Sequence, residues 1–226
     1  MTDEKRTVGE NERIAIARAV IYRFLSRCFS HPDRELIELF SSARLEEFLQ
    51  AWCYLGLEGL EHVARVANWL KARPNQEAVL VELEKEYTRL FITAYPKTIA
   101  PPYSSVYLDK ERLVWGESTA EAARLYEAAG LGISENFHDI PDHIAAEFEF
   151  VSYLISEQLR DRDNSTRITA LDQIQKDFLS SHLLRWSPEF LSRVAEFSQI
   201  PFYQVVAGLA REFLVAETQH LGKAHH

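Results

Sequence analysis

The amino-acid sequence predicts an all-α fold, a single compact domain of about nine or ten helices. The chain has eight glycines and eight prolines in 226 residues, about half the usual share, which leaves few turns. Apolar residues recur every three or four positions along most of the chain, as on one face of a helix. Convincing β-alternation is absent. We expect the domain to span residues 11–221, with 1–10 and 222–226 as flexible tails.

The first half of the chain contains five helical patterns. The first pattern begins at Asn11 and stops before Pro32, and Pro32 suits the first turn of the next helix. The clearest pattern of the five covers residues 76–92, where apolar side chains form one stripe and most charged side chains lie off it. The predicted ranges are 11–29, 33–40, 45–52, 60–70 and 76–92.

Residues 93–116 interrupt the helical pattern and predict an irregular loop. The loop contains three prolines and three tyrosines: Pro96, Pro101, Pro102, Tyr95, Tyr103 and Tyr107. A long irregular segment within a compact helical domain is usually functional or disordered. The aromatic content argues against disorder, so this loop is a candidate functional segment.

Helical patterns resume after the loop and continue to the end of the domain. Ser118 and Glu121 have the spacing of a capping box. Pro141, Pro188 and Pro201 are expected to open three later helices, because proline is favoured in the first helical turn. The predicted ranges are 118–130, 141–160, 166–184, 188–198 and 201–221.

Composition excludes several functional classes. The formal net charge is −9, and an acidic chain is a poor general nucleic-acid binder but suits a cationic partner. No apolar stretch is long enough to span a membrane, and the start lacks the apolar run of a secretory signal. Cys28 and Cys53 fall in apolar helical patterns and are interpreted as reduced core thiols. We therefore expect a cytoplasmic protein without membrane insertion.

Enzyme motifs are sparse. The chain lacks a nucleophile elbow, a P-loop, a dinucleotide-binding glycine motif and a C-x-x-C pair. Two E-x-x-H pairs, Glu135 with His138 and Glu217 with His220, match part of a helical di-iron site. His138 and Asp139 match the dyad of a metal-dependent phosphohydrolase. A helical-bundle metalloenzyme is therefore the alternative, although neither pair sits well inside a predicted helix and no metal or other cofactor is expected.

Three motifs carry a resemblance to a known family. They are E-Y-x-x-L-F at 86–91, P-P-Y-x-S-x-Y at 101–107 and P-D-H-x-x-x-E-x-x-F at 141–150. In this order and spacing, together with W-S-P-E-F at 186–190, they resemble the TorD/DmsD/NarJ family of chaperones. The resemblance covers about residues 15–215 and is carried by the three motifs together rather than by any one of them.

The resemblance implies an all-helical cytoplasmic chaperone without catalytic activity. Such a chaperone binds the twin-arginine signal peptide or N-terminal region of an apo molybdopterin-containing oxidoreductase subunit. It holds that subunit until the cofactor is inserted, which prevents premature export. W-G-E at 115–117 departs from the family pattern, so the client reductase stays open, and both a monomer and a domain-swapped dimer are compatible with the chain.

The motifs also supply the candidate residues for client binding. They are Tyr87, Leu90, Phe91, Pro101, Pro102, Tyr103, Ser105, Tyr107, Asp142, His143 and Glu147. Plain core packing is the competing interpretation for Leu90 and Phe91. Pro101 and Pro102 stiffen the loop, so that its tyrosines can form an aromatic wall at low entropic cost.

The site is expected where the 101–107 loop meets the helix that Pro141 opens. Asp142 would accept a guanidinium group through two hydrogen bonds. His143, near a helix N-terminus, would be neutral and would accept a hydrogen bond.

Overall fold

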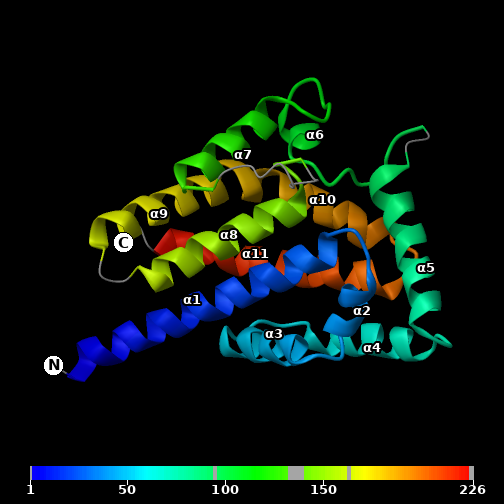
Figure 1. The fold of residues 1–226 in the computed structure, drawn as a ribbon, viewed down its shortest axis with the longest axis horizontal. Helices are drawn as coiled ribbons and strands as arrows, with labels where there is room; N and C mark the ends of the chain where they lie inside the picture. Colours follow the sequence, from blue (N-terminus) through cyan, green and yellow to red (C-terminus); the bar gives the residue numbers. More distant parts are fainter. Residues whose placement is uncertain (1, 94–95, 132–139, 162–163, 224–226) are drawn as a thin grey trace.

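The computed structural model describes residues 2–93, 96–131, 140–161 and 164–223, and all regular structure in these ranges is helical (Figure 1). The α-helices are α1 (Thr2–Phe29), α2 (Arg34–Leu39), α3 (Ala43–Tyr54), α4 (Val63–Lys71), α5 (Gln76–Tyr87), α6 (Ser105–Leu108), α7 (Glu117–Ala128), α8 (Ile144–Arg160), α9 (Ser165–Phe178), α10 (Leu184–Phe197) and α11 (Pro201–Lys223). Three shorter segments are a 3-10 turn, η1 (Leu60–His62), and two π-helical turns, η2 (Thr88–Ile92) and η3 (Leu179–Leu183). The all-α prediction is confirmed, and α6 is a single turn within the predicted loop.

The first and last helices extend further than the apolar pattern predicts. α1 is helical from Thr2 rather than from Asn11, and α11 continues to Lys223. Glutamate, lysine and arginine are good helix formers, so the polar start of the chain can continue the helix without contributing an apolar stripe. The predicted start of the first helix at Asn11 is therefore wrong.

Three predicted helix starts are also wrong. α8 begins at Ile144 rather than at Pro141. Pro188 lies inside α10, which follows directly from the π turn η3. α7 begins at Glu117, so Ser118 is not its N-cap; instead the carboxylate of Asp109 accepts the backbone N–H of Ser118 at 3.2 Å. A side chain from across the loop thus replaces the local capping box.

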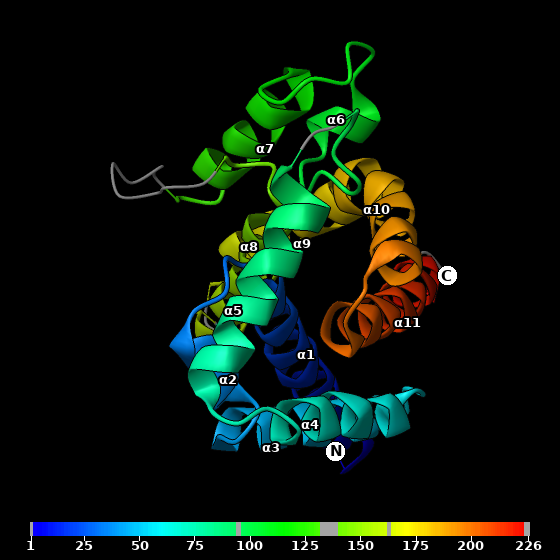
Figure 2. The same cartoon turned by 90° about the vertical axis from the view of Figure 1, so that its right-hand side faces the viewer.

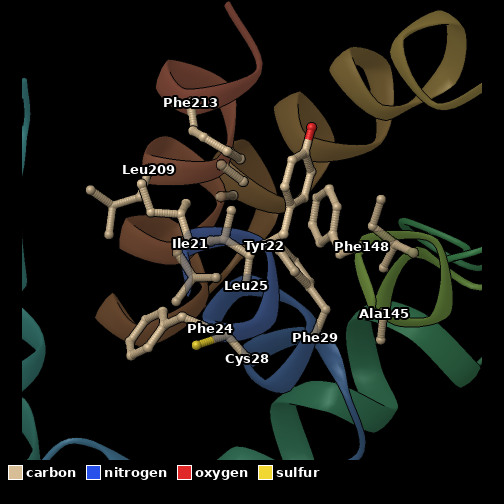
Figure 3. Close-up of a cluster of buried hydrophobic side chains, with 14 of the residues drawn as sticks. Ile21, Tyr22, Phe24, Leu25, Cys28, Phe29, Ala145, Phe148, Leu209 and Phe213 are labelled. Carbon is tan, nitrogen blue, oxygen red and sulfur yellow. The ribbon is translucent and has the colours of Figure 1, made fainter. Parts of the chain in front are cut away.

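The core forms where α1 packs along α8 and α11 packs along α10 (Figure 1). Tyr22 of α1 lies between Phe148 of α8 and Phe213 of α11, with ring centroids 5.9 and 4.7 Å apart (Figure 3). All three rings are buried, and such aromatic contacts add to the free energy gained from burying the rings. This cluster fixes the central helices against one another.

Two pairs of helices lie at opposite ends of this core. α6 and α7 lie at one end and α3 and α4 at the other (Figure 2). In the described part of the chain, no helix is long and apolar enough to cross a membrane. Cys28 is buried as predicted, but Cys53 is exposed, because α3 turns its neighbours Ala51 and Trp52 inward instead.

Candidate functional site

The second and third motifs meet in space through their backbones. The N–H of Ser104 donates to the carbonyl of Asp142 at 3.0 Å, and the N–H of Ile144 donates to the carbonyl of Pro102 at 2.9 Å. Tyr103 and His143 form the bridge between these two bonds. The expected meeting of the 101–107 loop with the start of the α8 helix is therefore confirmed, as a short antiparallel pairing.

Asp142 holds this pairing from inside the protein. Its side chain is fully buried, and its Oδ2 accepts the backbone N–H of Ser105 at 2.9 Å and the hydroxyl of Ser104 at 3.4 Å. A buried carboxylate requires such internal donors. The carboxylate thus faces the loop backbone rather than a surface that a guanidinium group would approach, and its role in the structure is to position the loop.

His143 is the N-cap of α8. Its Nδ1 accepts the backbone N–H of Ala145 at 3.1 Å, and its ring lies 5.3 Å from the ring of Tyr103 in an edge-to-face contact. This ring nitrogen accepts a hydrogen bond, but its donor is the helix itself rather than a client peptide. The imidazole is buried, so it supports Tyr103 from below the surface.

Glu147 joins α8 to η3 and α10. Its carboxylate accepts Nε1–H of Trp186 at 2.9 Å and lies 2.8 Å from Nε2 of His182, and all three side chains are buried. Burial raises the pKa of Glu147, although His182 and Trp186 oppose that shift. Burial lowers the pKa of His182, but the charge and the hydrogen bond of Glu147, together with the charges of Glu121 and Asp142, outweigh burial, so the pKa lies above its ordinary value. This cluster lies beneath the loop, and we call the buried residues that hold the loop in place the frame.

The first motif packs at the end of α5. Leu90 and Phe91 are buried in the π turn η2, and the carbonyl of Leu90 accepts the backbone N–H of Ala100 at 2.9 Å. Tyr87 is also buried, with its ring 4.9 Å from that of Phe91. The core interpretation therefore describes all three side chains, and the π turn anchors the beginning of the loop. π turns of this kind occur frequently at functional sites.

Glu86 completes this anchor and was not among the predicted site residues. Its carboxylate accepts two hydrogen bonds from Arg89, at 2.7 and 2.9 Å, and one from the backbone N–H of Gln199 at 2.6 Å. Burial raises the pKa of Glu86, but these donors outweigh it and hold the pKa below its ordinary value. The available signal was its place as the first residue of the E-Y-x-x-L-F motif.

A groove opens on the surface of the loop, between η2, α6 and α10. Its volume is about 810 Å³, and we call it the 96–114 groove after the loop segment that contributes most of its lining. Four predicted residues line it: Phe91, Pro101, Tyr103 and Tyr107. Such a volume lies within the range of ordinary ligand pockets.

Tyr107 fixes one side of the groove to α10. Its ring lies 5.3 Å from that of Trp186, and the guanidinium group of Arg193 lies 5.7 Å from its centroid. Arg193 also pairs with Glu189 at 2.8 Å on the same helix. The aromatic lining is therefore held by a rigid helix on one side and by the paired loop on the other.

Exposed apolar side chains at the groove margin were not among the predicted site residues. Leu113 is 65% exposed, and Ile92 is 58% exposed. Val114 also lines the groove, and the adjacent Trp115 is 70% exposed with a positive φ of 70°. An exposed apolar patch of this kind marks an interaction surface. The available signal was the L-V-W run at 113–115, which follows charged residues and belongs to no helical stripe.

The predicted site residues thus divide into two sets. Phe91, Pro101, Tyr103 and Tyr107 line the groove. The other predicted residues are buried outside its lining: Tyr87, Leu90, Pro102, Ser105, Asp142, His143 and Glu147.

Among the residues that the structure describes, no set of metal ligands supports the metalloenzyme alternative. Glu135, His138 and Asp139 lie outside the described residues. Glu217 is occupied by Arg18, which donates two hydrogen bonds of 2.7 Å to its carboxylate, and by the hydroxyl of Tyr22 at 2.9 Å. Within the described ranges, no three His, Cys, Asp or Glu side chains gather as metal ligands would.

Comparisons with known proteins agree on one family. The nitrate reductase delta subunit family matches residues 57–192. A protein described as chaperone protein TorD from Vibrio cholerae is 30% identical over 201 residues, which cover 87% of this chain and 88% of the relative. Its counterpart from Aliivibrio salmonicida is 27% identical and covers 90% of this chain and 94% of the relative.

A solved structure shares the arrangement of the helices. It is a crystal structure from Archaeoglobus fulgidus assigned to redox enzyme maturation, with a TM-score of 0.51 and 27% sequence identity. The match covers 87% of this chain and 93% of the solved chain.

Proposed function

Since the chain belongs to the TorD/NarJ family of non-enzymatic chaperones, we propose that it binds the signal peptide or N-terminal region of an apo molybdopterin-containing oxidoreductase subunit. In this proposal the chaperone retains the subunit in the cytoplasm until the cofactor has been inserted. The 96–114 groove receives the apolar part of the client segment.

The observation that carries this proposal is the apolar, aromatic groove on a rigid frame. The groove combines half-buried Tyr103 and Tyr107 with exposed Leu113 and Val114. Large apolar side chains exposed side by side gain free energy when a partner covers them. Aromatic side chains are also the usual anchors of binding hot spots, since they bury much area at little conformational cost.

The frame explains why the groove is suited to a peptide. Asp142 and His143 fix the loop from one side, and Glu86 fixes its beginning from the other. A recognition loop held in one conformation loses less conformational entropy on binding than a free loop would lose. The buried residues of the motifs therefore contribute to binding through the shape of the groove.

The test is a titration of a labelled peptide with two arginines followed by an apolar stretch of about 15 residues. Tyr103→Ala should weaken binding by about 1–3 kcal/mol, the scale of a hot spot. Its matched control is Tyr54→Ala, because Tyr54 is 45% exposed on α3, away from the groove. Leu113→Ala should likewise weaken binding, whereas Val81→Ala on α5 should not.

Two results would contradict the proposal. One is equal binding by Tyr103→Ala and Tyr54→Ala; the other is no binding by the parent protein. If the parent instead self-associates and Leu113→Ala makes it monomeric, the groove is a contact between two copies of the chain. Sedimentation velocity on the same samples distinguishes this occupant from a client peptide.

A further inference from the structure

The charges on the 96–114 groove have the opposite sign to the charge of the whole protein. Four cationic side chains line the groove: Lys97, Lys110, Arg112 and Arg193. Only two carboxylates, Glu111 and Glu189, accompany them. The chain as a whole carries a formal net charge of −9. The groove therefore concentrates positive charge on an otherwise acidic molecule.

The positive charge is also available to a partner. Arg193 is paired with Glu189 at 2.8 Å, so these two charges largely cancel. Lys97, Lys110 and Arg112 are exposed, and no ion pair joins them to a carboxylate among the residues that the structure describes. A concave surface lined by one sign of charge attracts the opposite sign and repels its own.

We propose that the groove selects an apolar peptide segment flanked by acidic residues, and that the arginines of a signal peptide lie outside it. This inference rests on the proposed function and adds the charge preference of the same groove. The net acidity of the chain would suggest the reverse, namely attraction of arginines. Local charges decide contact specificity, because a distant charge on the protein is screened beyond a Debye length of about 10 Å at 0.1 M salt.

The experiment compares two labelled peptides with the same apolar core. One has two aspartates on each side of the core, and the other has two arginines on each side. At 0.05 M salt the aspartate peptide should bind about tenfold more tightly, because it meets the exposed cations of the groove. At 1 M salt, where the Debye length is about 3 Å, the two affinities should converge.

Charge-reversal variants locate the preference. In the double variant Lys97→Glu and Lys110→Glu, the arginine peptide should become the tighter ligand. Lys71→Glu is the matched control, since Lys71 is exposed at the end of α4, and α4 lies on the opposite side of the core from α6 (Figure 2). This control should keep the preference of the parent.

The outcomes distinguish failure of this inference alone from failure of the proposed function. Tighter binding of the arginine peptide to the parent would overturn this inference and leave the proposed function standing. A preference that the double variant does not change would also overturn it, because the charges responsible would lie elsewhere. Binding of neither peptide would overturn the proposed function and this inference with it.

Discussion

Replacing Glu147 with alanine is expected to destabilise the whole frame beneath the groove. The carboxylate is fully buried and connects α8 to His182 of η3 at 2.8 Å and to Trp186 of α10 at 2.9 Å. Trp186 in turn contacts Tyr107 of the groove, with ring centroids 5.3 Å apart. The substitution therefore removes the acceptor that connects the three elements.

The magnitude follows from the groups left behind. Glu147→Ala deprives the indole N–H of Trp186 of its acceptor, and an unsatisfied buried donor costs about 1–3 kcal/mol. It also leaves His182 without its partner in the interior, and breaking a buried ion pair costs about 3–5 kcal/mol. These two costs describe overlapping contacts, so we expect the free energy of unfolding to fall by about 3–5 kcal/mol rather than by their sum.

Urea unfolding followed by circular dichroism measures this loss. Glu149→Ala is the matched control, because Glu149 is the same residue type on the same helix but is exposed. The control should change the free energy of unfolding by no more than about 0.5 kcal/mol. If Glu147→Ala also loses less than about 1 kcal/mol, the buried cluster does not stabilise the frame and the reasoning is refuted.

Three further outcomes are expected. Asp142→Ala should lower the free energy of unfolding, measured by urea unfolding, by about 1–3 kcal/mol, since the Ser105 N–H loses its acceptor. Unchanged stability would make Asp142 a candidate for direct client contact again. The free energy of unfolding should fall as pH rises through the raised pKa of His182, and the raised pKa of Glu147 acts in the same direction. Urea midpoints measured from pH 6 to 9 would contradict this if they stayed level or rose with pH. His182→Gln should make the midpoints less dependent on pH. Tyr107→Phe should keep the melting temperature, because its buried hydroxyl has no hydrogen-bond partner in the described ranges; a fall of several degrees would reveal a partner.

The order of the helices followed from apolar spacing, but their ends did not. Apolar periodicity reports which face is buried, and this signal is strong in helices such as α4 and α10. It carries no information on a polar helical start such as residues 2–10. Nor does it reveal that Asp109 from the loop caps α7, so that Ser118 lies inside the helix. Contacts between distant parts of the chain decide those ends.

The sequence predicted which two segments meet, but not which of their side chains are buried. The motifs identified the loop and its partner at the start of α8, and these meet through Tyr103 and His143. The groove lining separates Phe91, Pro101, Tyr103 and Tyr107 from the residues that support the loop, and sequence alone does not give the burial of Asp142 or Glu147. The exposed Leu113 was missed because an apolar residue in a loop predicts a buried anchor as readily as a binding surface.

Photocrosslinking tests the central claim, that the 96–114 groove receives the client, most directly. A signal-type peptide with a photoreactive phenylalanine analogue at the centre of its apolar stretch is irradiated in complex with the full chain, and the attachment sites are mapped by mass spectrometry. We expect attachment within residues 96–114 and near Arg193 on α10. Attachment concentrated instead at the apolar groove between α1 and α3, around Ile16 and Tyr54, would contradict it.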